Sequence, residues 1–252
     1  MINPKITDWQ GRRVWLIGAS SGIGAALASE LAGRGARLAL SARRADKLAA
    51  LEPKNALRLP CDATDGSHLV AARAALLAAW GGVDLVVYLA GDYVPMRAEQ
   101  FDLATAERLL AVNYLGALRL TATVLADLPA GGGIAFVASV AGYGGLPKAL
   151  AYGPGKAALI HLAECLYFDL SPRRIGVWVI NPGFVATPLT AKNDFKMPAL
   201  MTPERAASAL ADGFATGGFE IHFPKRFTRW LKLASLLPYR WYFPLVRLIS
   251  GG

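Results

Sequence analysis

Cysteine, histidine and long apolar runs are all scarce in this chain of 252 residues, and each scarcity excludes a class of protein. Only Cys61 and Cys165 are present, too few for a disulfide framework, so reduced thiols and a cytoplasmic location are expected. The three histidines and two cysteines show no metal-ligand spacing, and no metal site is expected. No apolar run reaches the roughly 18 residues that span a bilayer. Asp8, Arg12 and Arg13 interrupt the stretch that a signal peptide requires.

The last acidic residue of the chain is Glu220, and no acidic residue follows it. Six basic residues follow it without a counter-charge: Lys225, Arg226, Arg229, Lys232, Arg240 and Arg247. These six account for most of the formal net charge of +9 and leave +3 for the residues before them. The basic character therefore belongs to a tail, and no nucleic-acid partner is expected.

Short apolar runs alternate with longer helical patterns between residues 12 and 223. Strands are predicted at 13–17, 37–41, 56–60, 84–89, 134–138, 176–180 and 219–223, and helices at 23–34, 44–51, 65–80, 102–128, 155–170 and 203–215. This alternation predicts right-handed crossovers and a doubly wound α/β fold, with a parallel sheet of about seven strands and helices on both faces. We expect one domain over 1–221 and a basic, aromatic extension over 222–252.

A glycine-rich turn, Gly18-Ala19-Ser20-Ser21-Gly22-Ile23-Gly24, joins the first predicted strand to a helix. Glycines let the backbone approach a pyrophosphate closely, and the helix N-terminus offers free N–H groups to the anion. The predicted cofactor contacts in this Rossmann-type turn are Gly18, Ser20, Ser21, Gly22, Ile23 and Gly24. Two alternatives stay open: a plain tight turn, and the Gly-x-Ser-x-Gly elbow of an α/β hydrolase, with His222 the only histidine near the required late position.

The end of the second predicted strand, Ser41-Ala42-Arg43-Arg44, has no acidic residue to bond the ribose hydroxyls of NAD. A guanidinium binds a 2′-phosphate instead, through charge-assisted hydrogen bonds. Arg43 is nearer to the strand end, so it is the predicted contact, and NADP(H) is favoured over NAD(H). Asp62, after the third predicted strand, either caps a helix or bonds the adenine, and both interpretations stay open.

Tyr152 is the only tyrosine with a lysine, Lys156, four residues later. On a helix this spacing places both side chains on one face. A phenol has a pKa near 10 and exchanges protons poorly at neutral pH. A neighbouring ammonium, together with the positive charge of an oxidised nicotinamide, lowers that pKa.

With these motifs the chain resembles the short-chain dehydrogenase/reductase family over about residues 10 to 223. The matching residues are Gly18, Gly22, Gly24, Asp62, Asn113, Ser139 thirteen residues before Tyr152, Lys156, Asn181-Pro182-Gly183 and Thr187. Several motifs in the same order are far more specific than any one of them. Three features depart from the family pattern, one of which is Ile17 in place of the threonine that commonly precedes the first glycine. Tyr88-Leu89-Ala90-Gly91 replaces Asn-Asn-Ala-Gly, and Gly153-Pro154-Gly155 requires the helix to begin very near Tyr152.

The resemblance implies a role for each of these residues. Tyr152 would be the general acid in reduction and the base in oxidation, and Ser139 would hold the substrate oxygen. Lys156 would bond the nicotinamide ribose, and Asn113 would hold a water in a proton relay. Further cofactor contacts would come from Ala90, Gly91, Pro182, Gly183, Val185 and Thr187. The family also implies a homo-oligomer, either a dimer or a tetramer.

The tail places seven aromatic residues among its six basic ones. A helix over 225–237 would carry its basic residues on one arc and Phe227, Trp230, Leu231, Ala234 and Leu237 on the other. A second helical piece follows Pro238 and reaches residue 249. This pattern is typical of a helix at an anionic membrane surface, and packing against the cleft or another subunit is the alternative.

We therefore expect an NADP(H)-dependent oxidoreductase that interconverts a carbonyl and a secondary alcohol. The tail and the apolar segment 188–201, which would cover the cleft, indicate an apolar, lipid-like small molecule as substrate. The alternative is a catalytically weak protein of the same fold that senses cofactor or is recruited to a membrane. Intact Asn113, Ser139, Tyr152 and Lys156 argue against that alternative.

Overall fold

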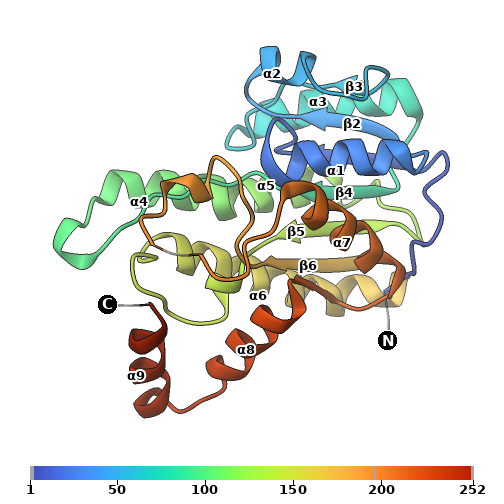
Figure 1. Ribbon diagram of the computed structural model, residues 1–252. Coiled ribbons are helices and arrows are strands. Elements are labelled where there is room, and N and C mark those ends of the chain that lie inside the picture. The colour runs from blue at the N-terminus through green and yellow to red at the C-terminus, as the bar shows by residue number, and fades with distance from the viewer. Residues whose placement is uncertain (1–2, 196, 251–252) are drawn as a thin grey trace.

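Seven parallel strands form one sheet in the computed structural model of this protein, which describes residues 3–195 and 197–250. The strands occur in the spatial order β3-β2-β1-β4-β5-β6-β7 (Figure 1). Their bounds are β1 Arg13–Ile17, β2 Arg37–Ser41, β3 Leu57–Arg58, β4 Leu85–Tyr88, β5 Gly133–Val137, β6 Gly176–Pro182 and β7 Glu220–Phe223. The order reverses between β1 and β4, the point at which doubly wound sheets bind ligands. The predicted Rossmann-type α/β fold is confirmed.

Helices cover both faces of the sheet (Figure 1). One face carries α1 (Gly22–Gly33) and α7 (Pro203–Ala215), and the other carries α3 (Gly66–Trp80), α5 (Gly116–Val124) and α6 (Tyr152–Leu170). Further helices are α2 (Ala45–Ala49), α4 (Leu103–Leu110), α8 (Lys225–Ser235) and α9 (Tyr239–Ser250). Because the inner strands are buried on both faces, their sequences are continuously apolar instead of alternating.

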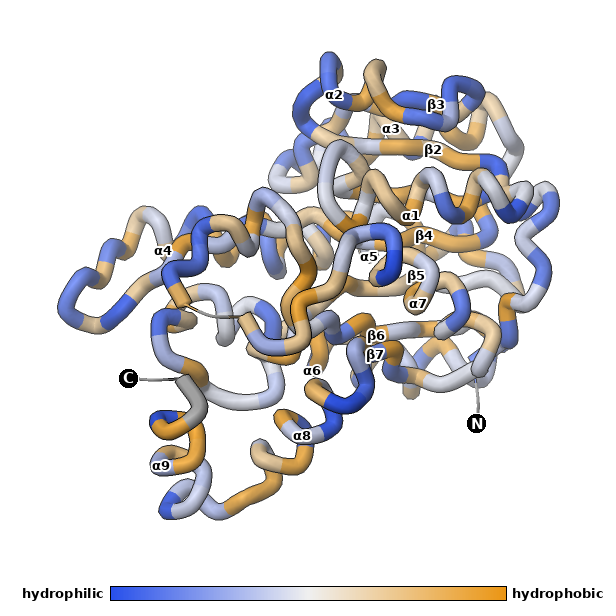
Figure 2. Tube along the Cα trace, viewed as in Figure 1, coloured by the Kyte–Doolittle hydropathy of each residue, from blue (hydrophilic) through white to orange (hydrophobic). Residues whose placement is uncertain are grey.

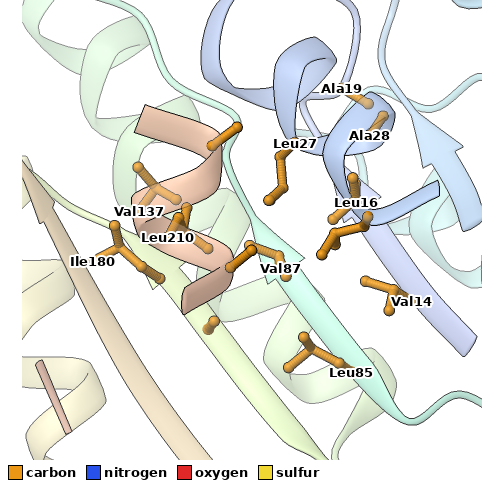
Figure 3. Close-up of a cluster of buried hydrophobic side chains, with 14 of the residues drawn as sticks. Val14, Leu16, Ala19, Leu27, Ala28, Leu85, Val87, Val137, Ile180 and Leu210 are labelled. Carbon is orange, nitrogen blue, oxygen red and sulfur yellow. The ribbon is translucent and has the colours of Figure 1, made fainter. Parts of the chain in front are cut away.

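Two apolar clusters, one on each face of the sheet, form the core. Figure 3 shows the first, where Leu27 of α1 and Leu210 of α7 lie over Val87 of β4. In the second, Leu120 of α5 and Leu159 of α6 are fully buried. Burying one leucine stabilises a fold by about 1.5–3 kcal/mol, so these clusters fix the strand ends on which the site is built.

The main differences from the predicted extents lie in four elements, the first of them α6, which begins at Tyr152, three residues before its predicted start at 155. β3, at the edge of the sheet, is shortened to two residues, although the amides of Leu59 and Cys61 beyond it still donate hydrogen bonds to the carbonyls of Leu40 and Ala42. The helix predicted over 102–128 is α4 and α5 separated by a π-helical turn at Ala111–Leu115. β6 extends two residues beyond its predicted end, to Pro182.

The tail forms α8 and α9, with Pro238 in the segment between them (Figure 1). Both predicted helical pieces are therefore present. β7 ends at Phe223, so the sheet extends two residues past the expected boundary between 221 and 222. Among the described residues, no helix is both long enough and apolar enough to cross a membrane.

Candidate active site

A cleft lies along the carboxyl ends of the strands, where a doubly wound sheet places its ligand. It is lined by all sixteen residues predicted to contact the cofactor: Gly18, Ser20, Ser21, Gly22, Ile23, Gly24, Arg43, Asp62, Ala90, Gly91, Tyr152, Lys156, Pro182, Gly183, Val185 and Thr187. Ser139 lines the cleft as well, whereas Asn113 is fully buried behind its lining. The fold therefore gathers into one site residues that follow each of the strands β1 to β6.

The glycine-rich turn after β1 has no room for side chains at two of its glycines. Gly18 has a φ of +94°, and a Cβ there would lie 2.5 Å from the backbone nitrogen of Ala90. A Cβ at Gly24 would lie 2.3 Å from the carbonyl oxygen of Gly18. Ser21, the N-cap of α1, makes no side-chain capping bond, so the first N–H groups of the helix stay available to an anion. This cradle fits a pyrophosphate.

The hydrolase alternative finds no support in this geometry. A serine nucleophile at Ser20 would need a histidine within hydrogen-bond reach as its base. His222 does not line the cleft, and its Nδ1 lies 2.6 Å from the hydroxyl of Thr228 in α8.

Arg43 and Arg44 follow β2, line the cleft and are exposed to solvent. Neither forms an ion pair within the described part of the chain. The adjoining strand end is held in place by Ser41, whose carbonyl accepts a 2.7 Å hydrogen bond from the amide of Gly18. Two guanidinium groups are thus available beside the cleft.

The structure excludes the interpretation of Asp62 as a helix cap. The cap of α3 is Asp65, whose carboxylate accepts a 2.8 Å hydrogen bond from the amide of Ser67. Asp62 instead accepts hydrogen bonds from the amide and hydroxyl of Thr64, at 2.9 and 2.8 Å, and lines the cleft. This turn orients Asp62 at the edge of the site, where it is available to a ligand.

Ser139, Tyr152 and Lys156 meet at the carboxyl end of β5 and the first turn of α6. The hydroxyl of Ser139 accepts a 3.1 Å hydrogen bond from the amide of Ala141. Tyr152 is the first residue of α6, as the Gly153-Pro154-Gly155 segment predicts. The ammonium of Lys156 donates a 2.9 Å hydrogen bond to the carbonyl of Val137 and lies 5.5 Å from the centre of the Tyr152 ring.

Burial moves the pKa values of the phenol and the ammonium in opposite directions. It raises the pKa of Tyr152 to about 12, although a hydrogen bond with Ser139 acts to lower it. It lowers the pKa of Lys156 to about 7. In each case burial disfavours the charged form. Lys156 therefore does not by itself bring the pKa of Tyr152 near neutrality, and that lowering requires a further positive charge in the cleft.

Asn113 lies in the π-helical turn, a feature that often marks functional sites. Its amide group donates a 2.8 Å hydrogen bond to the carbonyl of Asp92, and its side-chain oxygen accepts a 3.3 Å bond from the Asp92 amide. A Cβ at Gly91 would lie 3.0 Å from that oxygen and 3.4 Å from Nζ of Lys156. Asn113 is thus near Lys156 and separated from the open cleft by Gly91, a position that suits a proton relay.

Tyr88 takes over a bracing role at the position where the family has asparagine. Its ring is buried, and its hydroxyl donates a 2.6 Å hydrogen bond to the carbonyl of Val112 in the π-helical turn. A Cβ at Gly116 would lie 2.3 Å from the Tyr88 hydroxyl. The tyrosine and the glycine therefore fit each other and fix the turn that carries Asn113.

Tyr93 is a site residue that the sequence analysis does not identify. It lines the cleft, and its ring meets the ring of Tyr152 edge to face with centroids 5.1 Å apart. The sequence contains one indication that Tyr93 belongs to the site. It stands two residues after Gly91, just beyond a predicted strand end. Tyr93 restricts the orientation of the Tyr152 ring.

The segment 188–201 covers the cleft as expected, although residue 196 lies outside the described residues. Ion pairs hold it on both sides: Lys192 with Asp92 at 2.8 Å, and Lys148 with Asp194 at 2.6 Å. Phe195 lines the cleft and is 40% exposed, so it marks the mouth. The apolar residues of this segment are visible in the sequence, whereas its ion pairs with Asp92 and Lys148 are not.

Comparisons with known proteins identify related oxidoreductases. A family model described as short chain dehydrogenase matches residues 12–197. An uncharacterized oxidoreductase of Myxococcus xanthus is 33% identical over 235 residues, covering 90% of this chain and 93% of the relative. The 3-ketodihydrosphingosine reductase of Bos taurus is 31% identical over 248 residues, covering 87% of this chain and 73% of that protein.

Solved structures show the same fold. A short chain dehydrogenase from Burkholderia cenocepacia J2315 in complex with NADP has a TM-score of 0.76 at 25% identity, covering 86% of this chain and 96% of the other. A dehydrogenase/reductase from Sinorhizobium meliloti 1021 has a TM-score of 0.76 at 26% identity, covering 85% and 94%. The family match, the parallel sheet and the shared motifs show that this chain belongs to the short-chain dehydrogenase/reductase family and is an oxidoreductase acting on CH–OH and C=O groups.

Proposed function

We propose that the protein is an NADP(H)-dependent oxidoreductase that interconverts a carbonyl group and a secondary alcohol in an apolar, lipid-like substrate. The family uses NAD(P), and the observation that carries the preference is Arg43. Its exposed guanidinium beside the cleft is matched to the 2′-phosphate that distinguishes NADP(H), and it has no carboxylate partner in the described chain. A similar solved structure contains NADP.

The apolar character of the substrate is supported by the remaining lining of the cleft. Beyond the predicted cofactor contacts, aromatic and aliphatic residues dominate it: Tyr93, Val140, Leu146, Phe184, Leu189 and Phe195. Apolar lining with few polar groups is typical of sites for apolar molecules. The similar bovine protein is named for reduction of 3-ketodihydrosphingosine, a lipid-like ketone.

The described residues have distinct roles in this proposal. When bound, the cofactor supplies or accepts the hydride. Tyr152 donates a proton to the substrate oxygen in reduction and accepts it in oxidation, while Ser139 orients that oxygen. Lys156 bonds the nicotinamide ribose, and Asn113 holds a relay water behind it. Orientation by these groups lowers the entropic part of the barrier.

We also propose a cytoplasmic protein that forms a homo-oligomer and contacts an anionic membrane surface through 225–249. Exposed apolar residues on α4 and α6, including Leu103 and Phe168, support contact between subunits. The division into a catalytic domain over 1–221 and an extension over 222–252 is part of this proposal, because α8 and α9 project beyond the sheet (Figure 1).

Hydride transfer by the purified full-length protein tests the proposal. Single-turnover reduction of a panel of ketones with NADPH and with NADH should show transfer, and NADPH should be preferred. Tight NADPH binding without transfer to any ketone, or any alcohol in reverse, would support the alternative of a cofactor-sensing protein. A preference for NADH would contradict the role of Arg43.

A further inference from the structure

We infer that α8 and α9 (residues 225–250, here called the docking pair) bind the protein to an anionic bilayer with the mouth of the cleft facing the lipid. A lipid-like substrate then enters from the bilayer instead of from water. This inference rests on the proposed function for the identity of the substrate, but its main test does not depend on turnover.

Large apolar side chains are exposed along the docking pair. Figure 2 shows stretches of hydrophobic residues in both α8 and α9. They are Trp230, Leu233, Leu236, Leu237, Tyr239, Trp241, Phe243 and Leu248. Leu248 is 82% exposed and Leu236 is 77% exposed. Exposed apolar groups gathered in so short a stretch are typical of an interaction surface.

The apolar arc expected on the first tail helix is divided by the fold. Phe227, Leu231 and Ala234 are partly or fully buried, whereas Trp230 is 74% exposed. The first tail helix can therefore pack against the protein and contact an external surface at the same time. The inner residues attach α8, and the outer ones remain available.

Charge identifies the occupant as an anionic surface. Lys225, Arg226, Arg229 and Arg240 have no carboxylate within ion-pair distance in the described chain. A second copy docking by the same face would bring these like charges together, because a two-fold interface is self-complementary. Anionic lipid offers opposite charge to the basic residues and an apolar interior to Trp230 and Leu248.

The inner side of α9 packs on a loop that lines the cleft. Tyr242 is 5% exposed, and its hydroxyl donates a 2.9 Å hydrogen bond to the carbonyl of Gly145. Tyr242 and Val246 form an apolar cluster with Leu146, and Leu146 also lines the cleft. The position of α9 is thus fixed relative to one side of the cleft.

The inner side of α8 contacts another part of the cleft lining, at Gly183 and Phe184. The ring of Phe227 lies 5.6 Å from that of Phe184, which lies 5.7 Å from that of Phe195 at the mouth. A Cβ at Gly183 would lie 2.9 Å from the Phe227 ring. Lys232 of α8 also pairs with Glu220 of β7. Because both helices are attached beside the mouth, a membrane that binds their outer faces meets the mouth as well.

Flotation with vesicles tests the docking. The full-length protein should float with phosphatidylcholine vesicles that contain phosphatidylserine, and much less with phosphatidylcholine alone. Trp230→Glu, Leu236→Glu and Leu248→Glu should each lower the partition coefficient by about tenfold, as expected when a buried apolar group is replaced by a repelled charge. Val70→Glu on α3 is the matched control, because Val70 is 55% exposed and lies outside the docking pair.

NADPH binding by each variant confirms that the fold is intact. Absence of flotation at low salt would overturn the docking, and so would an equal loss in Val70→Glu.

A polarity-sensitive label tests the orientation without turnover. The exposed Cys165 is replaced by serine, and Phe195→Cys places a fluorophore at the mouth. Its emission should shift to the blue on anionic vesicles, whereas a label at Val70→Cys should not shift. Flotation without a shift at position 195 would overturn entry from the bilayer and leave the docking in place.

Activity then separates this inference from the proposed function. The Leu248→Glu variant should reduce a vesicle-borne 2-tridecanone about tenfold more slowly than the wild type, in proportion to its lost partition, and a water-soluble ketone equally fast. Equal rates on the vesicle-borne ketone would contradict entry from the bilayer. Inertness toward every ketone would contradict the proposed function, while flotation and the label would still decide the docking.

Discussion

At the scale of the residue, we expect Tyr152 and Lys156 to make separable contributions to the proposed reaction. Tyr152→Phe is expected to abolish turnover and leave NADPH affinity nearly unchanged, because the phenol acts on the substrate oxygen. Lys156→Ala should impair both, because the ammonium is assigned to the ribose. Steady-state rates and fluorescence titration with NADPH measure the two effects. Wild-type turnover by Tyr152→Phe would refute the assigned roles.

The depressed pKa of Lys156 also predicts how stability depends on pH in protein stripped of nucleotide. The pKa falls from 10.5 to about 7 on burial, so between these values the unfolded state binds more protons than the folded one. The free energy of unfolding should therefore rise as the pH increases from about 7 to 10. Lys156→Met should flatten that rise in thermal melts, and an unchanged slope would show that Lys156 is charged when folded.

Arg43 decides the cofactor preference in our proposal. Arg43→Asp is expected to weaken NADPH binding by at least about tenfold, because a lost charge-assisted contact costs about 1.5–3 kcal/mol. NADH binding should stay equal or improve. Arg44→Asp is the comparison, since Arg44 lines the same cleft. If only Arg44→Asp weakens NADPH binding in titrations, the phosphate contact belongs to Arg44.

At the scale of the element, the π-helical turn depends on Tyr88. Tyr88→Phe leaves the carbonyl of Val112 without its part-buried 2.6 Å hydrogen bond, which costs about 0.5–1.5 kcal/mol. The melting temperature and kcat should both fall, while NADPH affinity is preserved, because Asn113 loses its fixed position. Tyr114→Phe in the same turn is the control, since its hydroxyl bonds no described residue. Equal effects in both variants would argue against the bracing role.

At the scale of the whole molecule, the uneven charge predicts an interaction that salt weakens. Each basic residue near an anionic surface contributes about 1 kcal/mol, and the Debye length falls from about 10 Å at 0.1 M salt to about 3 Å at 1 M. Flotation with anionic vesicles should decline over this range, while the exposed aromatic residues retain a salt-resistant fraction. Binding that is independent of salt would show that the basic residues do not face the lipid.

The docking pair also links the tail to the stability of the domain. Deleting 225–252 removes Lys232 from Glu220, which is mostly buried and keeps its pKa low partly through that pair. The melting temperature should fall even though NADPH still binds, because the paired carboxylate loses its partner. The tail is therefore part of the structure as well as a surface.

The sequence by itself determined the α/β order, the glycine-rich turn, the pairing of Tyr152 with Lys156 on one helix, and the excess charge of the tail. These features are local, since strand and helix periodicity, glycine spacing and a four-residue interval are each read within one segment. The Gly18 turn and the start of α6 at Tyr152 were predictable for this reason.

Only the tertiary structure decided the features that depend on residues far apart in the chain. The hydrogen bond from Tyr88 to Val112, the ring contact of Tyr93 with Tyr152, and the pKa of Lys156 all follow from burial and from neighbours on other elements. The orientation of the tail residues was also decided by the tertiary structure, because the tail sequence contains both apolar and basic residues and does not show which of them are buried. Which apolar residues face the cleft loop and which face outward depends on where the sheet ends and α9 turns back, and local periodicity does not contain that information.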